Sequence, residues 1–305
     1  MDIFIPDYCH LCPRRCGANR AAGNAGYCGA DHRLLVARAA LHEWEEPPIS
    51  AKAGSGTVFF SNCPLRCVYC QNAEITHGGF GLEITVERLA QIFLELQQQD
   101  AANINLVTAT QYLPWVISAL EHARTQGLTL PVVWNTSGYE TIETIATLAG
   151  FVDIYLTDFK YGKADDTADS AALRYSQAPD YFEVATEALD AMVQQTGAPL
   201  ISDGLMQRGV VVRHLLLPKR LEDSQAIMHF LWKRYGTRVL YSVMSQYTPL
   251  RHIAEYPELN APTENADYEA LLDYMDSLGM EDYFWQEGNA ARESFIPPFN
   301  ATGVQ

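Results

Sequence analysis

Cys63-Pro64-Leu65-Arg66-Cys67-Val68-Tyr69-Cys70-Gln71-Asn72 follows a β-branched and apolar run at residues 57–62, which we predict to be a strand. Its three cysteines are separated by three and then two residues. An iron–sulfur cubane that only transfers electrons takes four cysteines, so three thiolates leave one iron open to an exchangeable ligand. A zinc site completed by His77 is the alternative. The spacing behind a strand, with the aromatic Tyr69 before the last cysteine, favours the cluster.

After Cys70, short apolar runs alternate with longer amphipathic stretches, as expected when crossover helices join parallel strands. The pattern predicts an α/β fold, a partial (β/α)6 barrel of the TIM type. We expect its strands at residues 57–62, 103–108, 130–136, 152–157, 209–217 and 237–243. We expect its helices at residues 85–99, 112–126, 139–150, 181–195 and 222–235.

The two ends of the chain do not follow this alternation. Residues 1–53 are rich in Gly, Pro and Cys and are predicted to form a small metal-binding extension. The barrel is predicted to span residues 54–250. Residues 251–305 contain several prolines and are predicted to cap the barrel, with one helix near residues 265–278.

The extension carries a second group of cysteines, with glycines between them that let the backbone turn around a metal. Four thiolates so close together can close a tetrahedral zinc site or hold an auxiliary iron–sulfur cluster. Their spacing does not decide between the two. The predicted ligands are Cys9, Cys12, Cys16 and Cys28.

Polar residues at the ends of the predicted strands are the candidates for binding a small molecule, because chemistry in such barrels sits at the carboxyl ends of the strands. Taken singly, each is better explained as a loop residue or a helix cap. The candidates are Thr108, Thr110, Asn135, Ser137, Asp158, Lys160, His214 and Gln246.

Composition narrows the choice of partners. The chain has 305 residues, of which 37 are acidic and 21 basic, giving a formal charge of −16. This charge repels phosphate backbones, so we expect no nucleic-acid partner. No run approaches the roughly 20 apolar residues of a spanning helix, and the first residues lack the basic stretch of a signal peptide. We therefore expect a cytoplasmic protein with no membrane partner.

The cluster segment resembles that of the radical S-adenosylmethionine (SAM) superfamily, whose Cys-x3-Cys-x-aromatic-Cys loop binds a [4Fe-4S] cluster with SAM on the open iron. The resemblance covers about residues 54–250. Within this superfamily the chain is similar to proteins related to the pyruvate formate-lyase activating enzyme. The matching motifs are Cys70-Gln71-Asn72, Asn135-Thr136-Ser137-Gly138, Asp158-Phe159-Lys160 and Arg213-His214 before Pro218.

The resemblance implies roles for single residues around SAM. Tyr69 and Asn72 would lie near the adenine or the cluster, and His214 would contact a ribose hydroxyl. The ribose and the methionine carboxylate would be contacted by Asn135, Ser137, Asp158 and Lys160. Where the family often has Gly-Gly-Glu, this chain has Thr108-Ala109-Thr110, whose hydroxyls can accept from the methionine ammonium without adding charge.

The implied activity is an oxidoreductase-type reaction. An external donor such as a flavodoxin or ferredoxin would reduce the cluster, and SAM would be cleaved to a 5'-deoxyadenosyl radical that abstracts hydrogen. No catalytic residue beyond the cluster ligands is predicted. By analogy the substrate is a glycine of a glycyl-radical protein, although Gly54-Ser55-Gly56-Thr57 replaces the family's Gly-Pro-Gly-x-Arg segment. The alternatives are a small molecule or peptide as substrate, or a non-catalytic iron–sulfur or zinc protein.

Overall fold

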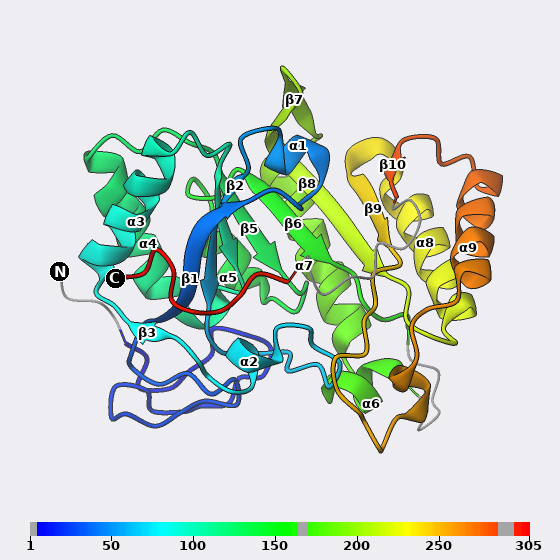
Figure 1. Cartoon of the computed structure of the whole chain (residues 1–305), viewed down its shortest axis with the longest axis horizontal. Coiled ribbons are helices and arrows are strands. Elements are labelled where there is room, and N and C mark those ends of the chain that lie inside the picture. Colours follow the sequence, from blue (N-terminus) through cyan, green and yellow to red (C-terminus); the bar gives the residue numbers. More distant parts are fainter. Residues whose placement is uncertain (1–4, 164–169, 286–295) are drawn as a thin grey trace.

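An open, mostly parallel sheet forms the centre of the molecule in the computed structural model, which describes residues 5–163, 170–285 and 296–305. Residues 1–4 and 286–295, in the predicted extension and capping segment, lie outside the described residues. The parallel strands lie side by side in chain order: β2 (Ser55–Phe60), β4 (Ile104–Val107), β5 (Val132–Thr136), β6 (Ile154–Asp158), β8 (Leu205–Leu215) and β9 (Leu240–Met244). The sheet ends at β3 (Leu82–Glu83) and β10 (Tyr283–Phe284) without closing, which confirms the predicted partial barrel (Figure 1).

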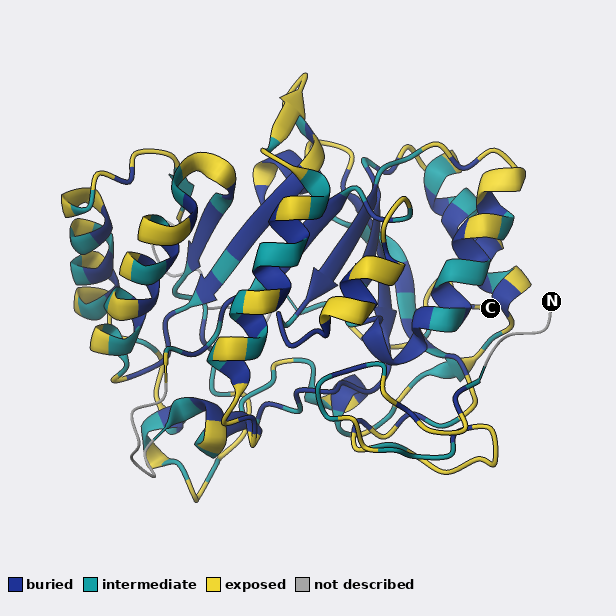
Figure 2. Ribbon diagram, turned by 180° about the vertical axis from the view of Figure 1, so that it is seen from behind, coloured by how far each residue is buried: buried dark blue, intermediate teal, exposed yellow. Residues whose placement is uncertain are grey.

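Helices cover the outer face of the sheet, as the view from behind shows (Figure 2). The first of them, α3 (Val86–Gln98), begins where Thr85 accepts a hydrogen bond from the Arg88 amide, and it buries one face that includes Leu89 and Phe93. The others are α4 (Leu113–Thr125), α5 (Ile142–Thr147), α7 (Tyr181–Thr196), α8 (Leu221–Tyr235) and α9 (Asn265–Ser277). The predicted helices agree with these within a few residues.

The structure adds elements that the sequence pattern did not predict. β1 (Leu35–His42) pairs antiparallel with β2, although we expected no strand in the extension. β7 (Leu200–Ser202) forms a hairpin with β8. The short helices are α1 (Pro47–Ser50), α2 (Ala73–Thr76), α6 (Ala171–Ser176) and the 3-10 turns Thr110–Tyr112, Gly236–Arg238 and Pro257–Asn260.

The inside of the barrel has an apolar layer near the amino ends of the strands and a polar layer near their carboxyl ends. Alternate residues of a strand face the same side. On β5, Val133 therefore faces inward with Asn135, and on β8, Val211 faces inward with Arg213. The apolar layer includes Val133, Val211 and Ile49 of α1, which packs against them at the amino ends of the strands. The polar residues lie nearer the carboxyl ends, where binding sites of such barrels form.

In the part of the chain that is described, no helix is both long and apolar enough to span a bilayer.

Candidate metal and cofactor site

The three cysteines after β2 line one cavity of about 180 Å³ at the carboxyl end of the strands. Cys63 and Cys67 are buried, and Cys70 is half-buried. Burial, and after it the neighbouring Cys67, raise the pKa of Cys63 to about 12. Burial also raises the pKa of Cys70. The thiols of Cys63 and Cys70 therefore stay protonated at neutral pH unless a metal replaces their protons.

The loop that carries the cysteines is held by α6, an element that the sequence pattern did not predict. The Val68 amide donates to the Tyr175 carbonyl over 2.8 Å. The Ser176 hydroxyl donates to Cys67 Sγ over 3.1 Å, and it lies 2.6 Å from the Tyr161 hydroxyl. Hydroxyl donors to a thiolate sulfur tune the potential of an iron–sulfur cluster. Ser176 and Tyr161 therefore belong to the site.

The donor set of the three thiols fits an iron–sulfur cluster with one open iron. Within the described residues, no three His, Cys, Asp or Glu side chains are grouped so that they could hold one metal ion. In a cubane each thiolate binds a different iron, so the sulfurs stand further apart than around one ion. Cys63, Cys67 and Cys70 on one cavity wall fit this donor set.

Most of the predicted cofactor contacts line the same cavity. One buried group suits a ligand with donors such as SAM: Asn72 Oδ1 has no hydrogen-bond partner among the described residues. SAM carries an ammonium, hydroxyls and an adenine amino group that can donate to such an acceptor. The predicted residues on the cavity wall are Tyr69, Asn72, Thr108, Asn135, Ser137, Asp158, Lys160 and Gln246.

A glycine shapes the wall next to Ser137. Gly138 has a φ of +78°, and a Cβ at this position would lie 2.3 Å from the Asp158 carbonyl oxygen. The end of β5 can therefore approach β6 closely only with glycine here. The Tyr181 hydroxyl donates to the Ser137 carbonyl over 2.7 Å and fixes this turn.

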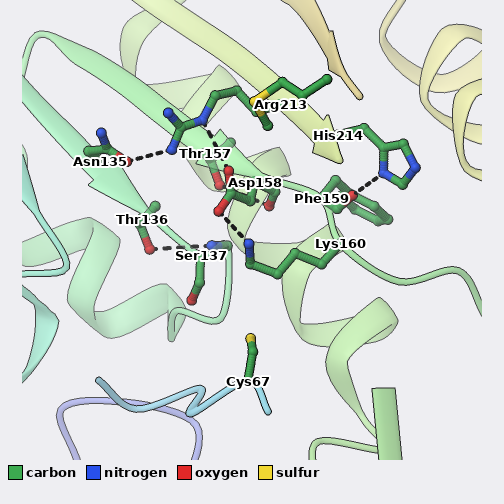
Figure 3. A network of polar contacts seen from close by, with 12 residues as sticks. Cys67, Asn135, Thr136, Ser137, Thr157, Asp158, Phe159, Lys160, Arg213 and His214 are labelled. Atoms are coloured by element: carbon green, nitrogen blue, oxygen red, sulfur yellow. Dashed lines mark hydrogen bonds and ion pairs between the residues drawn. The ribbon is translucent and has the colours of Figure 1, made fainter. Parts of the chain in front are cut away.

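Arg213, which the residue-by-residue prediction left out, links the polar side chains of the barrel. Its guanidinium donates to Asp158 Oδ1 over 3.0 Å, to Asn135 Oδ1 over 2.7 Å and to Glu45 Oε2 over 3.2 Å. Lys160 Nζ lies 2.7 Å from Asp158 Oδ2. Burial would raise the pKa of Asp158, but Lys160 and Arg213 outweigh it and hold the pKa below its usual range. Figure 3 shows this network with Cys67 on the Lys160 side.

Two residues that were predicted to contact SAM lie away from the cofactor cavity. His214 neighbours Arg213 on β8 and therefore faces the helices, where it bonds the Phe159 carbonyl (2.7 Å) and the Ser224 hydroxyl (2.8 Å). Figure 3 shows its ring turned away from the network. Thr110 is buried and donates to Glu140 Oε1 over 2.6 Å. Neither residue lines the cavity, so the geometry does not support their predicted roles toward SAM.

His214 is expected to make stability depend on pH. Burial lowers its pKa to about 4, while an exposed histidine has a pKa of about 6.5. The unfolded chain therefore gains a proton first, and the stabilisation is full above pH 6.5 and lost as pH falls toward 4. We expect wild type to lose about 2 kcal/mol more than His214→Gln between pH 7 and pH 5. Guanidinium unfolding at both pH values measures this, and equal losses would contradict the prediction.

The four cysteines of the extension are also close together. Cys9, Cys12 and Cys28 are buried, and Cys16 is exposed. A Cβ on Gly26 would lie 3.2 Å from Cys16 Sγ and 3.6 Å from Cys28 Sγ, so both sulfurs flank this glycine. Burial raises the pKa of Cys12, and Cys28 and Cys9 add to the shift. These thiols also lack the grouping of a preformed single-ion site.

One arginine ties the extension to the cysteine loop. The Arg14 guanidinium donates to the carbonyls of Pro64 (3.0 Å) and Leu65 (3.2 Å). It also donates to the carbonyl of Ser176 over 2.6 Å. A side chain with several parallel donors fits this arrangement better than a lysine would. Arg14 thus joins the extension, the loop between Cys63 and Cys67, and α6.

Comparison with known proteins gives a family and a fold. The family model of the radical SAM superfamily matches residues 57–230. A protein of Methanocaldococcus jannaschii, described as uncharacterized protein MJ0674, is 29% identical over 281 residues, which are 90% of this chain and 75% of that protein. A radical SAM methyltransferase from Sphaerobacter thermophilus is 13% identical, with a TM-score of 0.51 over 77% of this chain and 67% of that one. SuiB of Streptococcus suis, bound to precursor peptide SuiA, is 11% identical and has a TM-score of 0.48. The match covers 74% of this chain and 46% of SuiB.

Proposed function

This chain belongs to the radical SAM superfamily, and from that premise we propose that it cleaves SAM reductively at a [4Fe-4S] cluster to give a 5'-deoxyadenosyl radical for hydrogen abstraction. Cys63, Cys67 and Cys70 would hold the cluster. The observation that carries the proposal is that these thiols and the polar strand ends of the barrel line one cavity. An external donor such as a flavodoxin or ferredoxin would supply the electron.

The residues of the cavity would bind and orient SAM. Lys160 Nζ would attract a carboxylate, and Asn72 Oδ1 would accept a hydrogen bond. Arg213 and Lys160 keep Asp158 ionised, so that Asp158 can accept from sugar hydroxyls. Tyr69 lies in the same wall, and its hydroxyl accepts from that of Tyr161 over 3.0 Å. The barrel walls around the cavity would limit the access of water to a reactive radical.

Anaerobic reconstitution tests this proposal. Protein loaded with iron and sulfide and reduced with dithionite is expected to show the paramagnetic resonance signal of a [4Fe-4S]+ cluster. Added SAM should change that signal and be converted to 5'-deoxyadenosine, which chromatography with mass detection measures. A reduced cluster that leaves both its signal and SAM unchanged would overturn the proposal and favour a non-catalytic iron–sulfur protein.

For the substrate, the residues around the site favour a small molecule or a peptide side chain over a backbone glycine. Trp285, Ile296 and Pro297 of the C-terminal segment line the cavity next to the cofactor site, where a glycine loop would have to enter. A glycyl-radical partner remains the alternative, and it rests on the motif resemblance alone. Mixing the reduced enzyme and SAM with a glycyl-radical protein of the same genome decides between them. A stable glycine-centred radical on that protein would establish the alternative.

We also propose that the four cysteines of the extension bind a metal, as zinc or as an auxiliary cluster, and fasten the extension to the barrel. A purified variant in which Cys63, Cys67 and Cys70 are all replaced by alanine lacks the cluster ligands. It is expected to retain zinc or iron in metal analysis. If the metal is zinc, Cys12→Ser should clearly lower the melting temperature, while the folded variant should keep most of its SAM cleavage. Metal-free protein with an unchanged melting temperature would contradict this proposal.

A further inference from the structure

A second cavity, of about 230 Å³, adjoins the cofactor site inside the barrel. The two cavities share wall residues, among them Asn72, Asn135, Arg213 and Gln246. A molecule in the second cavity would therefore lie next to a molecule in the first. Hydrogen transfer requires such close contact between the reacting groups. The second cavity is thus placed to hold the substrate.

Its wall carries more negative than positive charge among the residues that the structure describes. The charged lining residues are Glu45, Glu46 and Arg213. His42 also lines the cavity, but burial lowers its pKa and keeps the ring neutral. Arg213 is already engaged by Glu45 and by Asp158. Burial raises the pKa of Glu46, although Arg213 and a hydrogen bond with Ser242 oppose this effect, so a ligand cation would favour its ionised form.

Glu46 is buried, with 8% of its surface exposed. Its Oε2 has no hydrogen-bond partner in the described part of the chain. The residue precedes α1, and the backbone there is fixed by Pro47 and by the bond from the Ile49 amide to the Glu46 carbonyl (2.8 Å). A buried carboxyl oxygen without a donor costs free energy, which a ligand donor can recover.

The rest of the wall suits an organic cation. Phe59, Phe284 and Trp285 contribute aromatic rings. Aromatic faces attract ammonium and guanidinium groups, most strongly where water is excluded. An anionic ligand would instead meet two carboxylates. Charge and aromatic lining therefore agree on one class of ligand.

We propose that this cavity binds the substrate through a protonated amine or guanidinium group, with Glu46 accepting its hydrogen bonds. The inference rests on the proposed radical SAM function and specifies its substrate class. Glu45 acts differently, because it positions Arg213 between the two cavities. The segment His42-Glu43-Trp44-Glu45-Glu46-Pro47 thus supplies the recognition element of the site.

Calorimetric titration of the reconstituted holoenzyme with SAM tests the proposal, using benzylamine and its neutral analogue benzyl alcohol as probes. Wild type is expected to bind the amine at least about tenfold more tightly. Glu46→Gln should reduce this preference to about threefold or less. Glu43→Gln is the matched control, because Glu43 is exposed and does not line the cavity, and it should keep the wild-type preference.

Three results would overturn the inference. These are equal binding of the two probes by wild type, no binding of benzylamine up to about 10 mM, or a full preference in Glu46→Gln. The wild-type comparison holds even if the variant does not fold. Formation of 5'-deoxyadenosine, measured in the same samples, tests the proposed function separately. SAM cleavage without an amine preference would remove only the inference.

Discussion

Replacing Cys63, Cys67 and Cys70 together by alanine is expected to reduce formation of 5'-deoxyadenosine to the background of a protein-free control. The three thiols are the cluster ligands, and a cluster that is not held cannot deliver an electron to SAM. The reduced variant should also lose the part of the [4Fe-4S]+ paramagnetic resonance signal that changes when SAM is added. Product assays and spectra of the same anaerobic samples measure both effects.

Cys16→Ala is the matched control for this experiment, because it also removes a thiol but from the extension. It should keep the cluster signal and most of the SAM cleavage. Full turnover in the triple variant would show that the loop does not hold the catalytic cluster. Loss of the cluster in Cys16→Ala alone would show that the two cysteine groups do not act separately.

Arg213→Met is expected to lower the free energy of unfolding by about 3–5 kcal/mol at pH 7. Arg213 lies between Glu45 and Asp158, and its removal leaves these buried carboxylates without a shared cation. The carboxyl pKa values then rise in the folded state, so both groups take up protons more readily. The deficit should therefore shrink as pH falls. Guanidinium unfolding of both proteins at pH 7 and pH 5 measures it.

Arg234→Met provides the comparison at the surface. Arg234 pairs with Asp190, and both side chains are more than 40% exposed. Loss of such a pair costs about 1 kcal/mol or less. Combining Arg213→Met with Glu45→Gln should recover part of the loss, because it removes one of the stranded charges. Equal costs for the two arginine variants would contradict the role given to the buried network.

The central strands could be predicted because each is a buried apolar run between clear helical segments. β5 and β6, for example, lie within the predicted residues 130–136 and 152–157, apart from the final Asp158. β1 was missed because its residues stand in a segment that the cysteines and glycines mark as irregular. α6 was missed because six residues are too few to show helical periodicity. The position of the loop that carries Cys67 therefore depends on α6, a short helix that the local sequence pattern does not predict.

The candidate site was predictable where chemistry and sequence position coincide. The cysteine spacing and the polar strand ends suffice for the residues that line the cofactor cavity. The motif Arg213-His214 was assigned through its histidine, but alternation along β8 puts only one of the two inside the barrel. The role of Glu46 depends on β1 and α1 folding back over the sheet. No local pattern in the sequence shows that contact.

The outer strands of the sheet have a consequence for association between molecules. Both β3 and β10, at the two ends of the sheet, contain only two residues. They therefore present few unpaired backbone groups to a second copy, and this limits growth of the sheet from molecule to molecule. β1 protects β2 in the same way, because it occupies the free edge of Ser-Gly-Thr-Val-Phe-Phe. A chain trimmed to begin at residue 54 would expose that apolar edge, and we expect such a chain to aggregate more readily.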